Sequence, residues 1–347
     1  MNRMSPYAAV ARARRARFEH YPARRRHLRR PVVSVGNLTV GGSGKTPAVA
    51  HIANLLLSMG ERPAILTRGY RRPEPSDGVV VVSDGERIRA DYPRAGDEPL
   101  MLAKALPGVA VFACPDRYLA GTLAERRFER SVHLLDDGFQ HVRLHRDLDL
   151  VLLSASDLDD DLLPLGRLRE SPEVAARADA LIVYADDEAA ARALADRVGV
   201  ATVFRVVARI GRPRAAQNPT VAAQTPTVAA QDFSPVNHRV LAVAGIARPR
   251  RFFDGLAAAG WDVAKEIAFR DHHRFTRADV DRLAREARDA SATLVLTTEK
   301  DLVRLLPYRP FPIEIAAVPL EFSIEPHLPF REWLQTRLAA VRASTVP

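Results

Sequence analysis

The sequence predicts an α/β protein in which helices flank a mostly parallel sheet and a smaller α/β lobe follows. Two observations support this prediction. Short apolar runs alternate with helical patterns from Pro31 onward, as expected when parallel strands are joined by helical crossovers. A glycine-rich segment separates the first run from the first helix. With 347 residues, 47% of them hydrophobic and 27% charged, the chain is long enough for one large domain or two ordinary domains with substantial cores.

The strand predictions rest on runs of β-branched and aliphatic residues bounded by turn residues. In chain order they cover 32–35, 64–67, 79–82, 109–113, 132–135, 148–153 and 181–184, with later strands at 294–297 and 313–318. The clearest helix begins at Thr46 and ends at Gly60, a residue that favours helix termination. Its apolar residues recur at helical spacing: Val49, Ile52, Ala53 and Leu56.

Composition divides the chain into four predicted segments. They are a basic N-terminal arm (1–30), a nucleotide-binding domain (31–210), a low-complexity insertion or linker (211–238) and a C-terminal lobe (239–347). The third segment repeats Pro, Thr, Ala and Gln with a period of seven, but Pro219 and Pro226 exclude a continuous coiled coil. We expect a flexible surface insertion there.

The arm holds ten arginines and one acid, Glu19, so its net charge of +9 equals the excess of the whole chain. A basic arm on a neutral body favours a polyanionic partner, either an anionic membrane or nucleic acid. A solvated, arginine-rich leader is the simpler alternative. Because Pro22 interrupts a helix, we expect one short amphipathic helix over roughly residues 5–20, then a basic connector.

The remaining composition argues against several classes of protein. No apolar run is as long as the stretch of about 20 residues that spans a bilayer. The N-terminus also lacks the apolar core of a secretory signal. One cysteine, Cys114, excludes an internal disulfide framework and suits a reducing compartment.

The segment TVGGSGKTP (39–47) nearly matches a phosphate-binding loop. In such a loop, small residues expose backbone amides to phosphate, a lysine reaches the β- and γ-phosphates, and a hydroxyl binds Mg²⁺. Thr39 stands where the strict pattern has glycine, and an ordinary glycine-rich turn is the alternative. Only four of the 51 basic residues are lysines, which favours the functional interpretation. The predicted ATP-binding residues are Thr39, Val40, Gly41, Gly42, Ser43, Gly44, Lys45 and Thr46.

Other features narrow the nucleotide and suggest a metal site. The segment TTEKD (297–301) does not fit the N-K-x-D pattern of guanine-specific proteins, so ATP is favoured. Asp136 and Asp137 end an apolar strand, where an acid can complete a Mg²⁺ site. Asp97 fits either a helix cap or a functional role. FRDHHRF (269–275) fits either a zinc site or the start of a surface helix.

Together the motifs resemble those of the tetraacyldisaccharide 4'-kinases, the lipid A 4'-kinases of Gram-negative bacteria. The resemblance covers most of the chain in order, through PVVSVGNLTVGGSGKTP (31–47), LTRGYRR (66–72), GDEPLMLA (96–103), LLDDGFQH (134–141), LLPLGRLRE (162–170), VAGIARPRRFF (243–253), FRDHHRFT (269–276) and LTTEKD (296–301). It implies a P-loop NTPase-like kinase fold, Mg²⁺-ATP as donor and an acylated glucosamine disaccharide 1-phosphate as acceptor. It also implies peripheral attachment to the cytoplasmic face of the inner membrane.

The resemblance further implies roles for single residues. Asp97 and His272 would form the pair that activates the 4'-hydroxyl, with Lys45 as the third catalytic residue. Glu170 would join Thr46, Asp136 and Asp137 at the metal. The substrate-binding candidates are Arg71, Arg117 and His141, and TTEKD receives no role. The insertion at 215–231 is not required by the family pattern.

A nucleic-acid-associated NTPase that uses the arginine-rich arm is the alternative function. The sequence has no helicase-like additional motifs and no aromatic and basic RNA-binding platform, so we predict a lipid substrate and no nucleic-acid partner.

Overall fold

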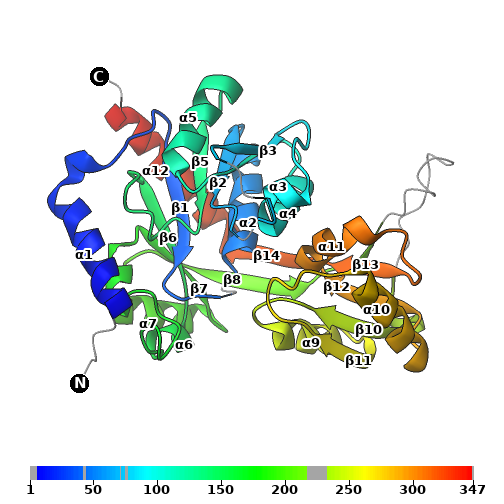
Figure 1. Cartoon of the computed structure of the whole chain (residues 1–347). Coiled ribbons are helices and arrows are strands. Elements are labelled where there is room, and N and C mark those ends of the chain that lie inside the picture. Colours follow the sequence, from blue (N-terminus) through cyan, green and yellow to red (C-terminus); the bar gives the residue numbers. More distant parts are fainter. Residues whose placement is uncertain (1–5, 42–43, 71, 75–76, 217–232, 346–347) are drawn as a thin grey trace. The chain divides into compact units, whose positions relative to one another are not determined.

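The computed structural model describes residues 6–41, 44–70, 72–74, 77–216 and 233–345 (Figure 1). The chain forms two compact units. Unit 1 comprises residues 1–207 and 322–347, and unit 2 comprises residues 208–321. The unit boundaries fall within two strands, β8 (Val203–Ile210) and β14 (Leu320–Glu325).

Unit 1 is built on a sheet whose described strands have the order β14-β8-β7-β6-β1-β5-β2-β4-β3. The central strands are parallel, and only β3 is antiparallel to its neighbour β4 among the pairs whose register is defined. The other strands are β1 (Val32–Asn37), β2 (Pro63–Thr67), β3 (Val80–Asp84), β4 (Ala110–Ala113), β5 (Val132–Asp136), β6 (Leu148–Ser154) and β7 (Ala180–Tyr184). The predicted mostly parallel sheet is therefore confirmed.

Helices cover this sheet and connect its strands (Figure 1). They are α1 (Pro6–His20), α2 (Lys45–Ser58), α3 (Tyr92–Ala95), α4 (Asp97–Ala105), α5 (Arg117–Phe128), α6 (Ala155–Leu158), α7 (Glu188–Val198) and α12 (His327–Thr345), with 3-10 turns η1 (Pro22–Arg24) and η2 (Pro172–Arg177). Helix α2 is the clearest predicted helix, and it buries the expected apolar face: Val49, Ile52, Ala53 and Leu56.

Unit 2 has a second sheet of order β11-β10-β12-β13-β9. Its strands are β9 (Arg214–Ala215), β10 (Arg239–Ala244), β11 (Asp262–Ala268), β12 (Leu294–Thr298) and β13 (Ile315–Val318). Strands β10 to β13 pair in parallel, and the short β9 is antiparallel to β13. Its helices are α9 (Pro249–Ala258), α10 (Arg277–Asp289) and α11 (Glu299–Leu305), with 3-10 turns η3 (Pro235–Asn237) and η4 (Leu306–Tyr308). This unit is the predicted smaller α/β lobe.

The predicted C-terminal boundary of the lobe is wrong, because residues 322–347 belong to unit 1. Helix α12 buries Phe330 and Leu334 completely, and the Phe330 ring lies 4.9 Å from the Phe204 ring of β8, centroid to centroid. The apolar face of α12 therefore completes the core of unit 1 rather than that of unit 2.

The prediction of an insertion over 211–238 is corrected at both ends. Arg214 and Ala215 form β9, and Phe233 is buried in the core of unit 2. The remaining part of the prediction, which concerns residues 217–232, lies outside the described residues.

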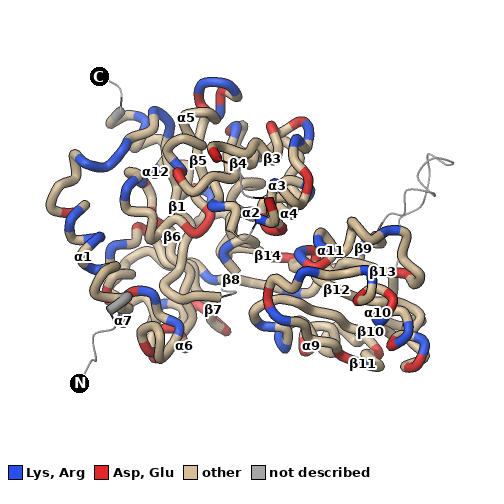
Figure 2. Tube along the Cα trace, viewed as in Figure 1, with Lys and Arg blue, Asp and Glu red and all other residues tan. Residues whose placement is uncertain are grey.

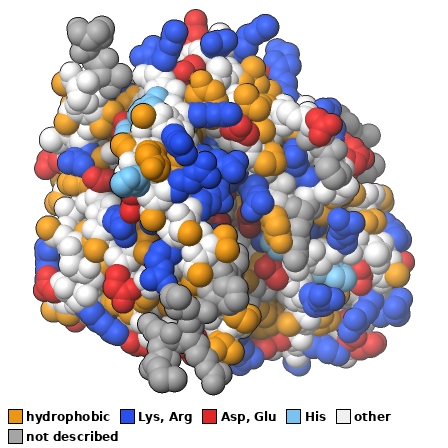
Figure 3. All heavy atoms as spheres, turned by 60° about the vertical axis from the view of Figure 1, so that its left-hand side comes forward, with side chains coloured by type: hydrophobic (Ala, Val, Ile, Leu, Met, Phe, Trp, Pro, Cys, Tyr) orange, Lys and Arg blue, Asp and Glu red, His pale blue; other side chains and the backbone are white. Residues whose placement is uncertain are grey.

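The arm forms the expected short helix, α1, which ends at His20 just before Pro22. Its arginines lie along the helix and the connector that follows (Figure 2), and Lys and Arg gather beside hydrophobic side chains on the face shown in Figure 3. The helix is not amphipathic in the expected sense, since Arg15 is 5% exposed whereas Val10 is 69% exposed. Within the described part of the chain, no helix is long and apolar enough to cross a membrane.

Candidate active site

The glycine-rich loop joins β1 to α2, so the predicted strand, loop and helix follow one another as expected. Gly44 precedes the helix with a φ of 81°, in the left-handed region that glycine adopts readily. A Cβ at this position would also collide with the Tyr184 hydroxyl. Gly42 and Ser43 lie outside the described residues. The loop leads directly into the amino end of α2, which begins with Lys45 and Thr46, and the amino end of a helix favours an anion such as phosphate.

Lys45 lies within a charged network. Its Nζ donates to Asn37 Oδ1 at 2.8 Å and lies 3.5 Å from Asp137 Oδ1. Arg169 donates to both carboxylate oxygens of Asp137, at 2.9 and 2.7 Å. Burial alone would raise the pKa of Asp137, but Lys45 and Arg169 outweigh it and hold the pKa below its usual range. Asp137 is therefore ionised at neutral pH.

Thr39, the departure from the strict loop pattern, has a structural role. Its Oγ1 accepts from Asn37 Nδ2 at 2.9 Å, which leaves Asn37 Oδ1 directed at Lys45 and Arg169. Val40 N donates to Arg167 O at 2.8 Å, and Arg169 N donates to Leu38 O at 2.7 Å. The segment that contains Arg169 is thus bonded to the start of the loop. Neither Asn37 nor Arg169 was predicted as a site residue.

Asp136 is the last residue of β5 and is buried. Its pKa is raised because of burial and because Glu98 and Asp137 lie nearby, and Lys45 and Arg117 offset this only in part. A buried carboxylate with this surplus of negative charge suits a divalent cation. Together with Asp137 and the Thr46 hydroxyl it matches the ligands of Mg²⁺, which takes one or two carboxylates and completes its shell with phosphates and water. The residues present therefore fit the predicted metal.

Glu170, the third predicted metal-binding acid, is 4% exposed and lies in a different environment. Both its carboxylate oxygens accept from Arg15 of α1, each at 2.7 Å. Gln140 Nε2 also donates to Glu170 Oε2, at 3.2 Å. The Glu170 carboxylate is thus already compensated by a protein cation.

Among the other predicted residues of unit 1, Arg117 acts electrostatically on both acids of the pair. Arg117 is the first residue of α5, and although burial lowers its pKa to about 10, it remains charged at neutral pH. Burial and Arg117 are the main causes that lower the pKa of His141 to about 4, so its imidazole is neutral at pH 7. Asp97 begins α4, is buried and accepts from Glu98 N at 2.9 Å. Arg71 lies outside the described residues.

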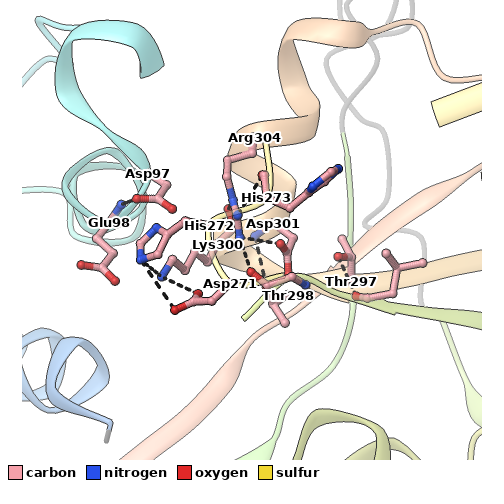
Figure 4. Close-up of polar contacts among 12 residues, drawn as sticks. Asp97, Glu98, Asp271, His272, His273, Thr297, Thr298, Lys300, Asp301 and Arg304 are labelled. Atoms are coloured by element: carbon pink, nitrogen blue, oxygen red, sulfur yellow. Dashed lines mark hydrogen bonds and ion pairs between the residues drawn. The ribbon is translucent and has the colours of Figure 1, made fainter. Parts of the chain in front are cut away.

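His272 belongs to unit 2, where it lies in a turn with a φ of 59°. Lys300 Nζ lies 3.3 Å from His272 Nε2 and 3.7 Å from Asp271 Oδ1 (Figure 4). The predicted start of a surface helix comes later, because Thr276 caps α10. His273 Nε2 pairs with Asp279 Oδ2 at 3.1 Å instead. The described residues contain no group of three or more His, Cys, Asp or Glu side chains placed to hold a metal ion, so they do not support the zinc alternative.

The TTEKD segment organises the loops around His272. Thr298 caps α11, and Asp301 accepts from Gly245 N at 3.0 Å (Figure 4). Arg304 pairs with Asp301 and donates to Gly245 O at 2.9 Å and to His273 O at 3.0 Å. The side chains of this pair are 0% and 1% exposed. The motif that received no role from the sequence therefore fixes both the turn at Gly245 and the His272 turn.

Comparison with known proteins identifies relatives over nearly the whole chain. A family model described as Tetraacyldisaccharide-1-P 4'-kinase matches residues 4–339. A tetraacyldisaccharide 4'-kinase of Geobacter metallireducens is 40% identical over 305 residues, which cover 87% of this chain and 86% of the relative. One of Koribacter versatilis is 40% identical over 314 residues, 88% of each. The crystal structure of the "apo" form of LpxK from Aquifex aeolicus in complex with ATP is similar with a TM-score of 0.74, 31% identity and 96% coverage of both chains.

Asp301→Ala should destabilise unit 2 by about 3–5 kcal/mol, because it leaves the buried Arg304 guanidinium without its partner. Chemical denaturation followed by circular dichroism measures this loss. Asp254→Ala is the matched control, since the Asp254 side chain is 62% exposed in its pair with Arg250 and its removal should change stability little. Equal stability of the two variants would contradict the structural role of Asp301.

Proposed function

The chain belongs to the tetraacyldisaccharide-1-P 4'-kinase family, and we propose that it transfers the γ-phosphate of ATP to the 4'-hydroxyl of a tetraacylated glucosamine disaccharide 1-phosphate. The observation that carries this proposal is the Lys45–Asp137–Arg169 network at the end of β1 and β5. This network brings the Lys45 ammonium, the Arg169 guanidinium and the Asp137 carboxylate together at a loop that suits a triphosphate.

Lys45 and the loop amides bind and orient the phosphates of ATP. Asn37 and Asp137 hold the Lys45 ammonium in place, where it would stabilise the negative charge of the γ-phosphate during transfer. Arg169 keeps Asp137 ionised and fixed. The Aquifex aeolicus protein was crystallised in complex with ATP, which supports ATP as the donor.

Thr46, Asp136 and Asp137 would hold Mg²⁺. When bound, the ion neutralises charge on the β- and γ-phosphate oxygens. Arg15 binds both oxygens of Glu170. We therefore propose that Glu170 supports the segment that contains Arg169 and does not bind the metal.

Asp97 and His272 are proposed to activate the acceptor. An alcohol does not ionise at neutral pH, so a base must take its proton as the phosphoryl group is transferred. A histidine paired with a carboxylate is held in one tautomer and is made more basic. In this proposal His272 takes the proton of the 4'-hydroxyl and Asp97 stabilises the imidazolium. Lys300, which contacts the imidazole, helps to set its orientation.

The acceptor would be held by the positive charge of Arg117 and by the neutral imidazole of His141, with Arg71 as a further candidate. The exposed arginines of the arm would hold the protein peripherally on the anionic cytoplasmic face of the inner membrane, each contributing on the order of 1 kcal/mol.

Lys45→Ala should lower kcat for phosphoryl transfer by about 10²–10³-fold while the fold stays intact, because it removes charge that stabilises the transition state. Radiolabelled ATP and a detergent-dispersed acceptor measure the loss, and circular dichroism checks the fold. Lys265→Ala, a partly exposed lysine of unit 2, serves as the control with wild-type activity. Near-normal transfer by the Lys45 variant would refute the assignment of the loop.

Asp97→Ala and His272→Ala should each lower kcat by about 10²–10⁴-fold with little change in KM, because both residues act on proton transfer. If they work as one pair, the double variant should be little worse than the more impaired single variant. Losses that multiply in the double variant would show that the residues act independently.

A further inference from the structure

Arg15 differs from the other arginines of the arm. Among the described arginines of residues 6–30 it alone is buried. Its Nε and one terminal nitrogen donate to the two oxygens of Glu170 at 2.7 Å each, and the same terminal nitrogen donates to Phe139 O at 3.1 Å. The guanidinium carbon lies 4.6 Å from the centroid of the Phe139 ring. Arg15 thus binds two segments that are more than 120 residues away in the sequence.

These two segments flank the acidic pair. Phe139 follows Asp137 by two residues, and Glu170 directly follows Arg169. Gln140 connects the segments to β1, since its Nε2 donates to Asn37 O at 2.9 Å and to Glu170 Oε2 at 3.2 Å. Arg169 then donates to Asp137 and to Asn37 Oδ1, the groups that hold Lys45. Arg15 is therefore connected to Lys45 through Glu170 and the adjacent Arg169, which contacts the two groups that hold the lysine.

A membrane-binding role does not explain this arrangement. A guanidinium that is 5% exposed and bidentate to a buried carboxylate is not available to lipid phosphate. Burying two charges is favourable only when their geometry and hydrogen bonds are close to ideal, which Arg15 and Glu170 satisfy with a parallel fork. The arm thus carries two kinds of arginine: exposed ones suited to an anionic surface, and one that is part of the protein interior.

We propose that Arg15 is a positioning residue for phosphoryl transfer, which makes α1 a structural part of the kinase site as well as a membrane-binding arm. By fixing Glu170 and Phe139, Arg15 holds Arg169 and Asp137 in the arrangement that directs Lys45 to the phosphates. This inference rests on the proposed function, because it assigns Arg15 to the same ATP site. Its consequence is that the helix is needed even when the acceptor is not in a membrane.

The test compares Arg15→Met with Arg17→Met in the full chain. Arg17 is an exposed residue of the same helix, so its substitution alters the charge of the arm without altering the buried contact. On a detergent-dispersed short-chain acceptor, Arg15→Met should lower kcat by about 10–100-fold, the usual effect of removing an outer partner of a bound group. The KM of Arg15→Met for the acceptor and its binding to anionic phosphatidylglycerol vesicles should change less than about twofold, which is small compared with the expected loss of kcat. Arg17→Met should keep wild-type kcat on the dispersed acceptor.

Two further measurements separate positioning from general loss of structure. Arg15→Lys keeps a cation but cannot donate as a fork, so the folded variant should show a kcat between those of wild type and Arg15→Met. ATP binding measured by calorimetry without acceptor should weaken about 10-fold in Arg15→Met. This binding readout does not depend on the identity of the acceptor, so it tests Arg15 even if the wild-type protein transfers phosphate to another alcohol.

Three results would overturn the proposal. The first is wild-type kcat and ATP affinity in folded Arg15→Met, and the second is wild-type kcat in Arg15→Lys together with an unfolded Arg15→Met. The third is an equal loss of kcat in Arg17→Met, which would show that the charge of the arm matters and not the buried contact.

Discussion

The site depends on the way one carboxylate, Asp137, is shared between two cations. Asp137 is bound by the Arg169 fork and lies within 3.5 Å of the Lys45 ammonium, so it stays ionised. Asn37 accepts from both cations and thereby sets their separation. A lysine that is held in this way loses little freedom when phosphate arrives, which is the preorganisation that transition-state stabilisation requires. Asp136, next to it, lacks comparable compensation and is the carboxylate that gains most from a divalent ion.

Unit 2 also contains a charged pair, and this pair fixes the conformation of loops. The buried pair of Asp301 and Arg304 holds the backbone of Gly245 and of His273. A pair of this kind stabilises little by itself but is costly to break, and so it fixes the conformation of the loops that it joins. The strained turn at His272, with its positive φ, persists because the surrounding contacts determine it. The turn that carries the proposed base is thus held by hydrogen bonds to Gly245 and Arg304.

The parts of this structure that sequence could predict are local. The β1 strand, the loop and α2 were predicted because strand period, glycines and helical spacing all lie within some thirty consecutive residues. Asn37, Arg169 and Arg15 were missed because their roles come from contacts between distant segments, and an arginine in an arginine-rich arm gives no signal that it is buried. The predicted boundary of the second lobe was wrong for the same reason, since the packing of α12 on unit 1 is a contact between distant segments.

The most direct test of the central claim is the position of the phosphate in the product. Purified wild-type protein is incubated with ATP, Mg²⁺ and a tetraacylated glucosamine disaccharide 1-phosphate, and the product is analysed by mass spectrometry and phosphorus NMR. We predict one added phosphate on the 4'-oxygen of the distal sugar, with Lys45→Ala as the inactive control. An unmodified acceptor, a phosphate at another hydroxyl, or ATP turnover that depends on DNA or RNA instead of the lipid would contradict it.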